Sequence, residues 1–297
     1  MREPTRALRQ EQTLQAPGDV RLARLTPVDE IDIKSAQVGL IGVGNMGQAL
    51  LVALLKAGAD ASKINFAVRR SERNHEIEER YGIKAASVEE MAASSDVLMI
   101  IVKPQDLESI MERVAPSLKP GSLVISFLAG KKIATVEAGL GNPAVARVMP
   151  NTPTLLGVGM SIVSYGKAVR PDQRRYVSDF LAAAGKSIEV AEELQDAATA
   201  TSGSGPAYFF AFVEAMVAGA VTMGIDEATA TTLVIQTIVG AAKMLDETGK
   251  SATTLRENVT SPKGVTYEGL KVFGEGDLAG LVARAMKAAA DRSRDLA

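Results

Sequence analysis

A glycine-rich turn near the start of the chain restricts the possible folds more than any other segment. Gly42-Val-Gly44-Asn-Met-Gly47 follows a short apolar stretch and precedes residues 46–56, where apolar residues recur with helical spacing. In a strand–turn–helix unit the first glycine allows a tight turn, the second lets a phosphate approach the backbone, and the third lets helix and strand pack closely. The helix N-terminus then offers amides and partial positive charge to phosphates. The turn therefore predicts a dinucleotide-binding domain of the Rossmann type.

Apolar strands and helices alternate along the following half of the chain. Ser87-Val-Glu-Glu90 is a capping box that starts a short helix, and Pro171 is a favoured first residue for another. The run at 97–102 is continuously apolar, as in strands that are buried on both faces. This alternation predicts an α/β fold with a doubly wound parallel sheet. The expected strands are residues 38–43, 64–68, 97–102, 123–127, 144–148, 160–164 and 187–190.

Strand signals end near residue 195, and the remainder is expected to be all helical. Glu214, Gln236 and Lys243 interrupt the longest apolar stretches, which are interpreted as buried helices of a soluble protein rather than membrane spans. These helices are apolar around most of their circumference and cannot bury that surface within one chain, so a homodimer is expected. The expected helices are residues 206–223, 227–247, 266–273 and 277–295, with a loop at 249–254.

The chain is expected to contain three parts, namely residues 1–35, 36–194 and 195–297. The first is interpreted as a flexible extension, the second as the NADP-binding Rossmann-type domain and the third as a helical dimerisation and substrate domain. The extension has no apolar segment of the secretory type, so a cytoplasmic location is expected, with organelle targeting as the alternative. The net charge of −2 provides no basic field, so neither nucleic acid nor a membrane is an expected partner.

Residue usage limits the chemistry that the chain can perform. It contains no cysteine, which excludes disulfides, thiol chemistry and cysteine metal sites. Its single histidine, His75, lies in a polar run without partners for a catalytic triad or a zinc site, and is interpreted as a solvated helix residue. No metal is expected. Acid–base chemistry must come from lysine, tyrosine, carboxylates, hydroxyls or the substrate.

The end of the second expected strand indicates which nicotinamide cofactor is bound. A site specific for NAD would place Asp or Glu there to bind the ribose 2′-hydroxyl. This chain has Arg69, Arg70 and Ser71 instead. Arginines suit a 2′-phosphate because they form charge-assisted, bidentate hydrogen bonds. The prediction is NADPH, with NADH as a weaker alternative.

Five further segments lie where a ligand would bind or where helices begin. Small, hydroxyl-rich turns of this kind present backbone amides and hydroxyls without bulk, which suits a small carboxylate-bearing substrate. The segments are Val102-Lys-Pro-Gln105, Ser126-Phe-Leu-Ala-Gly130, Met149-Pro-Asn-Thr-Pro153, Thr201-Ser-Gly-Ser-Gly-Pro-Ala-Tyr208 and Asn258-Val-Thr-Ser-Pro-Lys-Gly-Val-Thr266.

In this order, from about residue 37 to residue 295, these segments resemble those of the pyrroline-5-carboxylate reductases. The resemblance implies reduction of the cyclic imine 1-pyrroline-5-carboxylate to L-proline, the last step of proline biosynthesis. It also implies a dimer interlocked through the C-terminal helices, often assembled into decamers. A reductase of a related cyclic imine, such as a six-membered-ring analogue, is the alternative.

The resemblance also implies a role for individual residues. Thr266 is expected to be the catalytic hydroxyl that hydrogen-bonds the ring nitrogen. The expected substrate-binding residues are Ser261, Gly264, Val265 and Thr266. The expected cofactor-binding residues are Gly42, Gly44, Asn45, Met46, Gly47, Arg69, Arg70, Ser71, Val102, Lys103, Pro104, Ala129, Gly130 and Asn258.

Two departures and two rival classes accompany the resemblance. The family commonly has two glycines after the Ser-Pro, whereas this chain has Lys263-Gly264, and residues 1–35 match nothing in the family. A β-hydroxyacid dehydrogenase would carry a catalytic lysine in the helix after Gly203, which this chain lacks. A non-catalytic NADP sensor would not require the intact segment 258–266.

Overall fold

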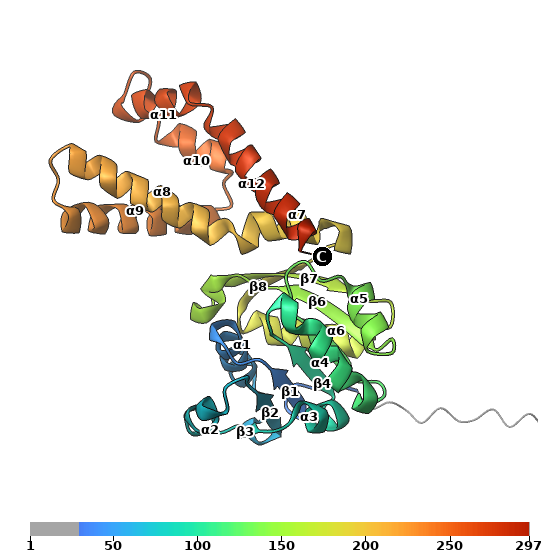
Figure 1. The fold of residues 1–297 in the computed structure, drawn as a ribbon. Helices are drawn as coiled ribbons and strands as arrows, with labels where there is room; N and C mark the ends of the chain where they lie inside the picture. Colours follow the sequence, from blue (N-terminus) through green and yellow to red (C-terminus); the bar gives the residue numbers. More distant parts are fainter. Residues whose placement is uncertain (1–29, 297) are drawn as a thin grey trace, which may run out of the picture.

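The computed structural model describes residues 30–296 and shows an α/β domain that continues into a long helical arm (Figure 1). The name helical arm is used below for residues 195–296. Most of the expected N-terminal extension, residues 1–29, lies outside the described residues, as does Ala297.

The α/β domain is built on one eight-stranded sheet with the order β3-β2-β1-β4-β5-β6-β7-β8. The strands are β1 (Val38–Ile41), β2 (Ile64–Ala67), β3 (Lys84–Ala85), β4 (Val97–Ile100), β5 (Leu123–Ser126), β6 (Ala144–Met149), β7 (Gly159–Tyr165) and β8 (Gly185–Glu189). The expected parallel arrangement is confirmed from β1 to β6 and is wrong at β7, which runs antiparallel to β6. Only a short 3₁₀ segment, Thr152–Leu156, joins these two strands, and a parallel pair would need a longer crossover.

Helices cover both faces of the sheet, as the doubly wound prediction requires. One apolar cluster joins the sheet to α1, α2 and α6, and a second joins the opposite face to α3, α4 and α5. The helices are α1 (Asn45–Lys56), α2 (Asn74–Tyr81), α3 (Val88–Ser94), α4 (Leu107–Val114), α5 (Ile133–Gly139) and α6 (Pro171–Ala182).

The capping box predicted at the start of α3 is confirmed. The amide of Glu90 donates to Ser87 Oγ at 3.1 Å, and the amide of Ser87 donates to the Glu90 carboxylate at 2.9 Å. The second of these hydrogen bonds is the main cause that lowers the pKa of Glu90 below its ordinary value. The exposed His75 on α2, 3.2 Å from Glu79, agrees with its interpretation as a solvated helix residue.

The last residues of the expected flexible extension are packed against the α/β domain. Ile33 is buried in the apolar cluster that contains α1 and α6, and the amide of Ile31 donates to Asp172 Oδ2 at 3.1 Å. The interpretation of residues 30–35 as flexible is therefore wrong. Periodicity did not reveal this contact because the segment is short and its partner lies far away in the sequence.

The helical arm contains α7 (Gln195–Ala198), a π-helix η7 (Thr199–Gly203), α8 (Gly205–Thr222), α9 (Glu227–Glu247), α10 (Ala252–Asn258), α11 (Val265–Glu275) and α12 (Leu278–Asp295). The loop expected at 249–254 is wrong in part, because Ser251 caps α10 through a hydrogen bond from the amide of Thr254 at 3.1 Å. Figure 1 shows α8 and α9 as an antiparallel pair that projects away from the sheet, while α12 returns to it.

The two long apolar helices are not buried within one chain. The stretches Glu192–Thr222 and Glu227–Glu247 are long and apolar enough to cross a membrane, yet at most 11% of either tested window is buried inside the molecule. Phe209 and Phe210 of α8 are each 62% exposed, and Val239 of α9 is 52% exposed. The expectation that one chain cannot bury these faces is therefore confirmed, because no other element of residues 30–296 packs over them.

The docking of residues 30–36 has a measurable consequence. We expect Ile33→Ala to lower the free energy of unfolding by about 2–3 kcal/mol, because a buried isoleucine leaves a cavity when truncated. Lys34→Ala, at the neighbouring exposed position, serves as the control and should change it by less than about 0.5 kcal/mol. Urea unfolding followed by circular dichroism at equal protein concentration measures both. Equal small effects would show that the segment does not contribute to the core.

Candidate functional site

The turn between β1 and α1 has the geometry that each of its glycines was expected to require. Gly42 has φ +101°, and a Cβ there would lie 2.5 Å from the carbonyl oxygen of Ile101. A Cβ on Gly47 would lie 2.3 Å from the carbonyl oxygen of Gly42, so the helix can approach the strand only with glycine there. Gly44 differs, since a Cβ would meet nothing within 4 Å. Its backbone faces open space, and this fits the close approach of a pyrophosphate.

The strand order brings the other expected cofactor residues to the same edge of the sheet. β1 pairs in parallel with both β2 and β4, and β4 pairs in parallel with β5. The carboxyl ends of parallel strands meet at one edge, so the segments that follow these strands gather around the β1–α1 turn. These are Gly42, Gly44, Asn45, Met46 and Gly47 after β1, Arg69, Arg70 and Ser71 after β2, Val102, Lys103 and Pro104 after β4, and Ala129 and Gly130 after β5.

Arg69 and Arg70 are exposed at the end of β2. Within residues 30–296 neither of them belongs to the arginines that pair with carboxylates. The nearby Arg73, in contrast, lies 3.7 Å from Glu76. Both guanidinium groups at 69 and 70 can therefore meet an anion without first breaking an ion pair.

The expected substrate loop lies far from this edge in the single chain. Asn258 ends α10 and Thr266 lies in the first turn of α11, at the outer part of the helical arm in Figure 1. Ser261, Val265 and Thr266 are all exposed. One chain therefore gathers the expected cofactor residues and leaves Asn258 and the substrate residues apart from them.

The loop has a tight backbone at the position where this chain departs from the family pattern. The amide of Gly264 donates to the carbonyl oxygen of Ser261 at 3.0 Å, and a Cβ on Gly264 would lie 2.3 Å from Ser261 Oγ. Lys263 has φ +58°, in the left-handed region that favours glycine. The first glycine of the usual pair matches this conformation, and the chain accepts lysine there at a cost in backbone strain.

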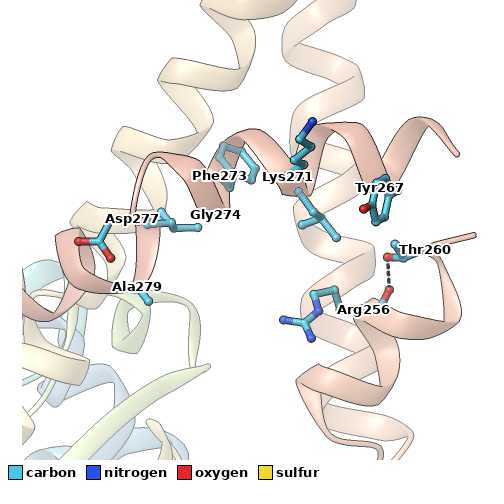
Figure 2. Close-up of a pocket in the computed structure, with 10 residues that line it drawn as sticks. Arg256, Thr260, Tyr267, Lys271, Phe273, Gly274, Asp277 and Ala279 are labelled. Atoms are coloured by element: carbon cyan, nitrogen blue, oxygen red, sulfur yellow. Dashed lines mark hydrogen bonds between the residues drawn. The ribbon is translucent and has the colours of Figure 1, made fainter. Parts of the chain in front are cut away.

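A cavity of about 580 Å³ lies on the helical arm rather than at the β1–α1 turn. Figure 2 shows Tyr267 and Phe273 of α11 on one side of it and Arg256 and Thr260 on the other. The Thr260 hydroxyl donates to the carbonyl oxygen of Arg256 at 2.6 Å. None of the expected cofactor residues lines this cavity, so it does not serve as the nucleotide site of this chain.

Sequence reasoning missed a buried charge cluster where the helical arm joins the sheet. Arg147 of β6 is only 4% exposed and lies 3.3 Å from Glu192 and 3.5 Å from Asp196. An arginine inside the apolar run Ala144–Val148 is a visible signal, because a charge in a buried strand needs partners. The identity of those partners was not visible, since they follow Arg147 in the sequence only after β7, α6 and β8.

Comparisons with known proteins match two parts of the chain to family models. Residues 192–296 match a family model described as pyrroline-5-carboxylate reductase dimerisation, and residues 37–130 match one described as NADP oxidoreductase, coenzyme F420-dependent. A pyrroline-5-carboxylate reductase of Corynebacterium melassecola is 40% identical over 87% of this chain and 98% of its own length. One from Arabidopsis thaliana is 34% identical over 90% of this chain and 97% of its own.

Solved structures of the same enzyme are similar to the whole described fold. The pyrroline-5-carboxylate reductase of Coxiella burnetii has a TM-score of 0.83 at 32% identity, and it covers 89% of this chain and 99% of its own. The pyrroline carboxylate reductase of Plasmodium falciparum, solved with NADP bound, has a TM-score of 0.79 at 29% identity, with 89% and 98% covered. The chain therefore belongs to the pyrroline-5-carboxylate reductase family.

Proposed function

We propose that this chain is an NADPH-dependent reductase that converts 1-pyrroline-5-carboxylate to L-proline. The observation that carries the proposal is the match to a pyrroline-5-carboxylate reductase over 98% of that enzyme's length. The two family-model matches include the glycine turn and the segment 258–266. Oxidation of NADPH on addition of pyrroline-5-carboxylate tests it. NADPH that binds but is not oxidised would favour a sensor, and activity only with a six-membered ring would favour the related imine reductase.

The edge of the sheet is the proposed site of the dinucleotide, which supplies a hydride to the imine carbon when bound. The backbone at Gly44 and the first amides of α1 would hold the pyrophosphate. Arg69, Arg70 and Ser71 would hold the 2′-phosphate. Val102, Lys103, Pro104, Ala129 and Gly130, at the ends of β4 and β5, would border the ribose and nicotinamide, and Asn258 would add a contact from the helical arm.

The loop before α11 is the proposed substrate site. Ser261, Gly264 and Val265 would bind the carboxylate through a hydroxyl and backbone amides, and Thr266 would hydrogen-bond the ring nitrogen. A protonated imine is activated for hydride attack, and the product is a basic amine. The protein therefore needs mainly to orient two rings and stabilise the charge at nitrogen, which hydroxyls and amides can do without histidine or cysteine.

A second copy of the chain is the proposed cover for the helical arm, in line with the match of residues 192–296 to a dimerisation model. It would bury the apolar faces of α8 and α9. It would also bring the loop 258–266 of one chain to the nucleotide edge of the other, which is the edge of the sheet formed by the carboxyl ends of its parallel strands. This arrangement would complete a site that one chain leaves divided. Assembly of such dimers into a decamer is part of the same proposal, and light scattering of the purified protein measures it.

The arginines after β2 should determine the cofactor preference. We expect Arg70→Ala to lower kcat/KM for NADPH by about tenfold or more and to leave NADH nearly unchanged, because a hydrogen bond to a charged group contributes about 1.5–3 kcal/mol. Arg69→Ala should act in the same direction. The control is Arg73→Ala, which removes an arginine already occupied by Glu76. An unchanged NADPH preference in both test variants would contradict the assignment.

Removal of the hydroxyl at position 266 should slow the reaction without loss of the cofactor. We expect Thr266→Ala to lower kcat at least tenfold, because a stabilising hydrogen bond at the reacting nitrogen contributes about 2–4 kcal/mol. Thr266→Ser should retain most of the activity, and NADPH binding measured by fluorescence should be unchanged in both. Thr253→Ala, an exposed threonine of α10, is the matched control. Normal turnover of Thr266→Ala would remove this residue from the mechanism.

A charge placed on the exposed apolar face should separate the subunits. We expect Val239→Glu to give monomers in size-exclusion chromatography with light scattering and to abolish most turnover, because burial of an unpaired carboxylate in an interface is unfavourable. Ala93→Glu, on the exposed face of α3, introduces the same charge elsewhere and should keep the wild-type assembly. Full activity of a monomeric Val239→Glu protein would show that one chain suffices for catalysis.

A further inference from the structure

The buried cluster around Arg147 links β6 and α5 to residues 192–196 and to α12. Glu192 Oε1 accepts a hydrogen bond from Arg147 Nη1 at 3.3 Å and one from the amide of Ile133 at 2.7 Å. Asp196 Oδ1 lies 3.5 Å from Arg147 Nη2 and accepts a hydrogen bond from the Ser293 hydroxyl at 2.8 Å. The guanidinium therefore lies between two carboxylates, each of which holds a further element.

Each of these elements belongs to a part of the proposed site. Ile133 begins α5, directly after the turn that contains Ala129 and Gly130. Ser293 lies in the last turn of α12, and the end of that helix touches the same turn, since a Cβ on Gly130 would lie 2.8 Å from the carbonyl carbon of Leu296. The cluster thus holds the start of the helical arm, at Asp196, and its end, at Ser293, beside the turn after β5 that contains Ala129 and Gly130.

The orientation of α12 bears directly on the substrate loop. Helix α11, whose first turn contains Thr266, ends at Glu275, and α12 begins at Leu278. The short link leaves little freedom between the two helices. A small tilt of α12 at its anchored end is therefore amplified at the loop 258–266, which lies at the outer part of the helical arm.

The charge of Arg147 is what keeps the two carboxylates of this junction in place. Without the guanidinium, Glu192 and Asp196 would face each other as uncompensated carboxylates in a largely buried place. Their other hydrogen bonds, to Ile133 and Ser293, would then have to rearrange. Arginine suits the position because its planar fork serves two acceptors at once, whereas lysine provides a point charge.

We propose that Arg147 is a positioning residue of the reductase. Through Glu192 and Asp196 it sets the orientation of the helical arm relative to the sheet of its own chain. In the proposed dimer this orientation determines how the loop 258–266 of one chain meets the nucleotide-binding edge of the other, and so the alignment of imine and nicotinamide. This inference rests on the proposed function. Arg147 is buried against Glu192 and Asp196 and is not one of the residues proposed to bind substrate or cofactor, so its effect should appear in the alignment of the reactants rather than in their affinity.

The test compares kinetics of Arg147→Met and Arg147→Lys with the wild type, using pyrroline-5-carboxylate and NADPH. We expect kcat of Arg147→Met to fall about 10- to 100-fold, because misplacement of reactants by about 1 Å has effects of that size. The dissociation constant of NADPH should change less than threefold. The deuterium isotope effect on kcat with 4-deuterated NADPH should rise, since hydride transfer becomes rate-limiting. Arg147→Lys should recover part of the loss.

Two further variants separate positioning from general stability. Arg174→Met is the matched control, because Arg174 also pairs with a glutamate, Glu189 at 2.8 Å, but lies outside the junction. Its kcat should stay within twofold of the wild type. Ser293→Ala removes only the hydrogen bond from α12 and should lower kcat in the same direction, about two- to fivefold, in a fully folded dimer.

The outcomes are distinct for this inference and for the function on which it rests. An unchanged kcat in Arg147→Met overturns the positioning role. If that variant and Arg147→Lys do not fold and Ser293→Ala behaves as wild type, Arg147 has only a structural role, which also overturns the proposal. A wild-type protein that does not oxidise NADPH with pyrroline-5-carboxylate overturns the proposed function instead.

Discussion

The helical arm cannot bury its own apolar faces, and much of the molecule's organisation follows from this constraint. Helices α8 and α9 pack against each other as a pair, yet Phe209, Phe210 and Val239 remain more than half exposed. Apolar surface of this extent favours association, because its removal from water is worth about 25 cal/mol per Å². The helical arm that contains α8 and α9 also carries the loop 258–266, between α10 and α11, so association and completion of the site become one event in the proposed dimer.

The α/β domain would provide the cofactor half of the proposed site, whose turn is shaped by close backbone contact. Gly42 and Gly47 permit an approach that no side chain would allow, and Gly44 leaves its backbone open. Parallel pairing of β1 with its neighbours then places the ends of β2, β4 and β5 around this turn. The cofactor half therefore depends on strand order, while the substrate half depends on where the helical arm points.

The junction between the two halves contains a buried ionic cluster centred on Arg147 of β6. A buried ion pair contributes little net stability compared with an apolar contact, but it tolerates few alternative geometries. Arg147 has two carboxylate partners and each carboxylate has a second hydrogen bond. Such an arrangement specifies one orientation of the helical arm, which suits a junction whose small rotations reach the substrate loop.

Features that depend on neighbouring residues could be predicted from the sequence. The glycine turn, the Ser87–Glu90 capping box and the start of α6 at Pro171 each involve residues within a few positions of one another. The docked Ile33 was missed because its partners lie far along the chain. The antiparallel β7 was missed although the short link that separates it from β6 is visible in the sequence and is too short for a parallel crossover. Helix α10 was missed for another reason, since it is short and polar and lacks an apolar stripe.

The sequence by itself determined the Rossmann-type class, the dinucleotide turn and the resemblance of the segment 258–266 to a substrate loop, because local pattern carries that information. Only the tertiary structure decided that this loop lies away from the nucleotide edge of its own chain. It also decided that Arg147 joins Glu192 to Asp196. These facts depend on how distant segments fold against one another, and no window of neighbouring residues contains them.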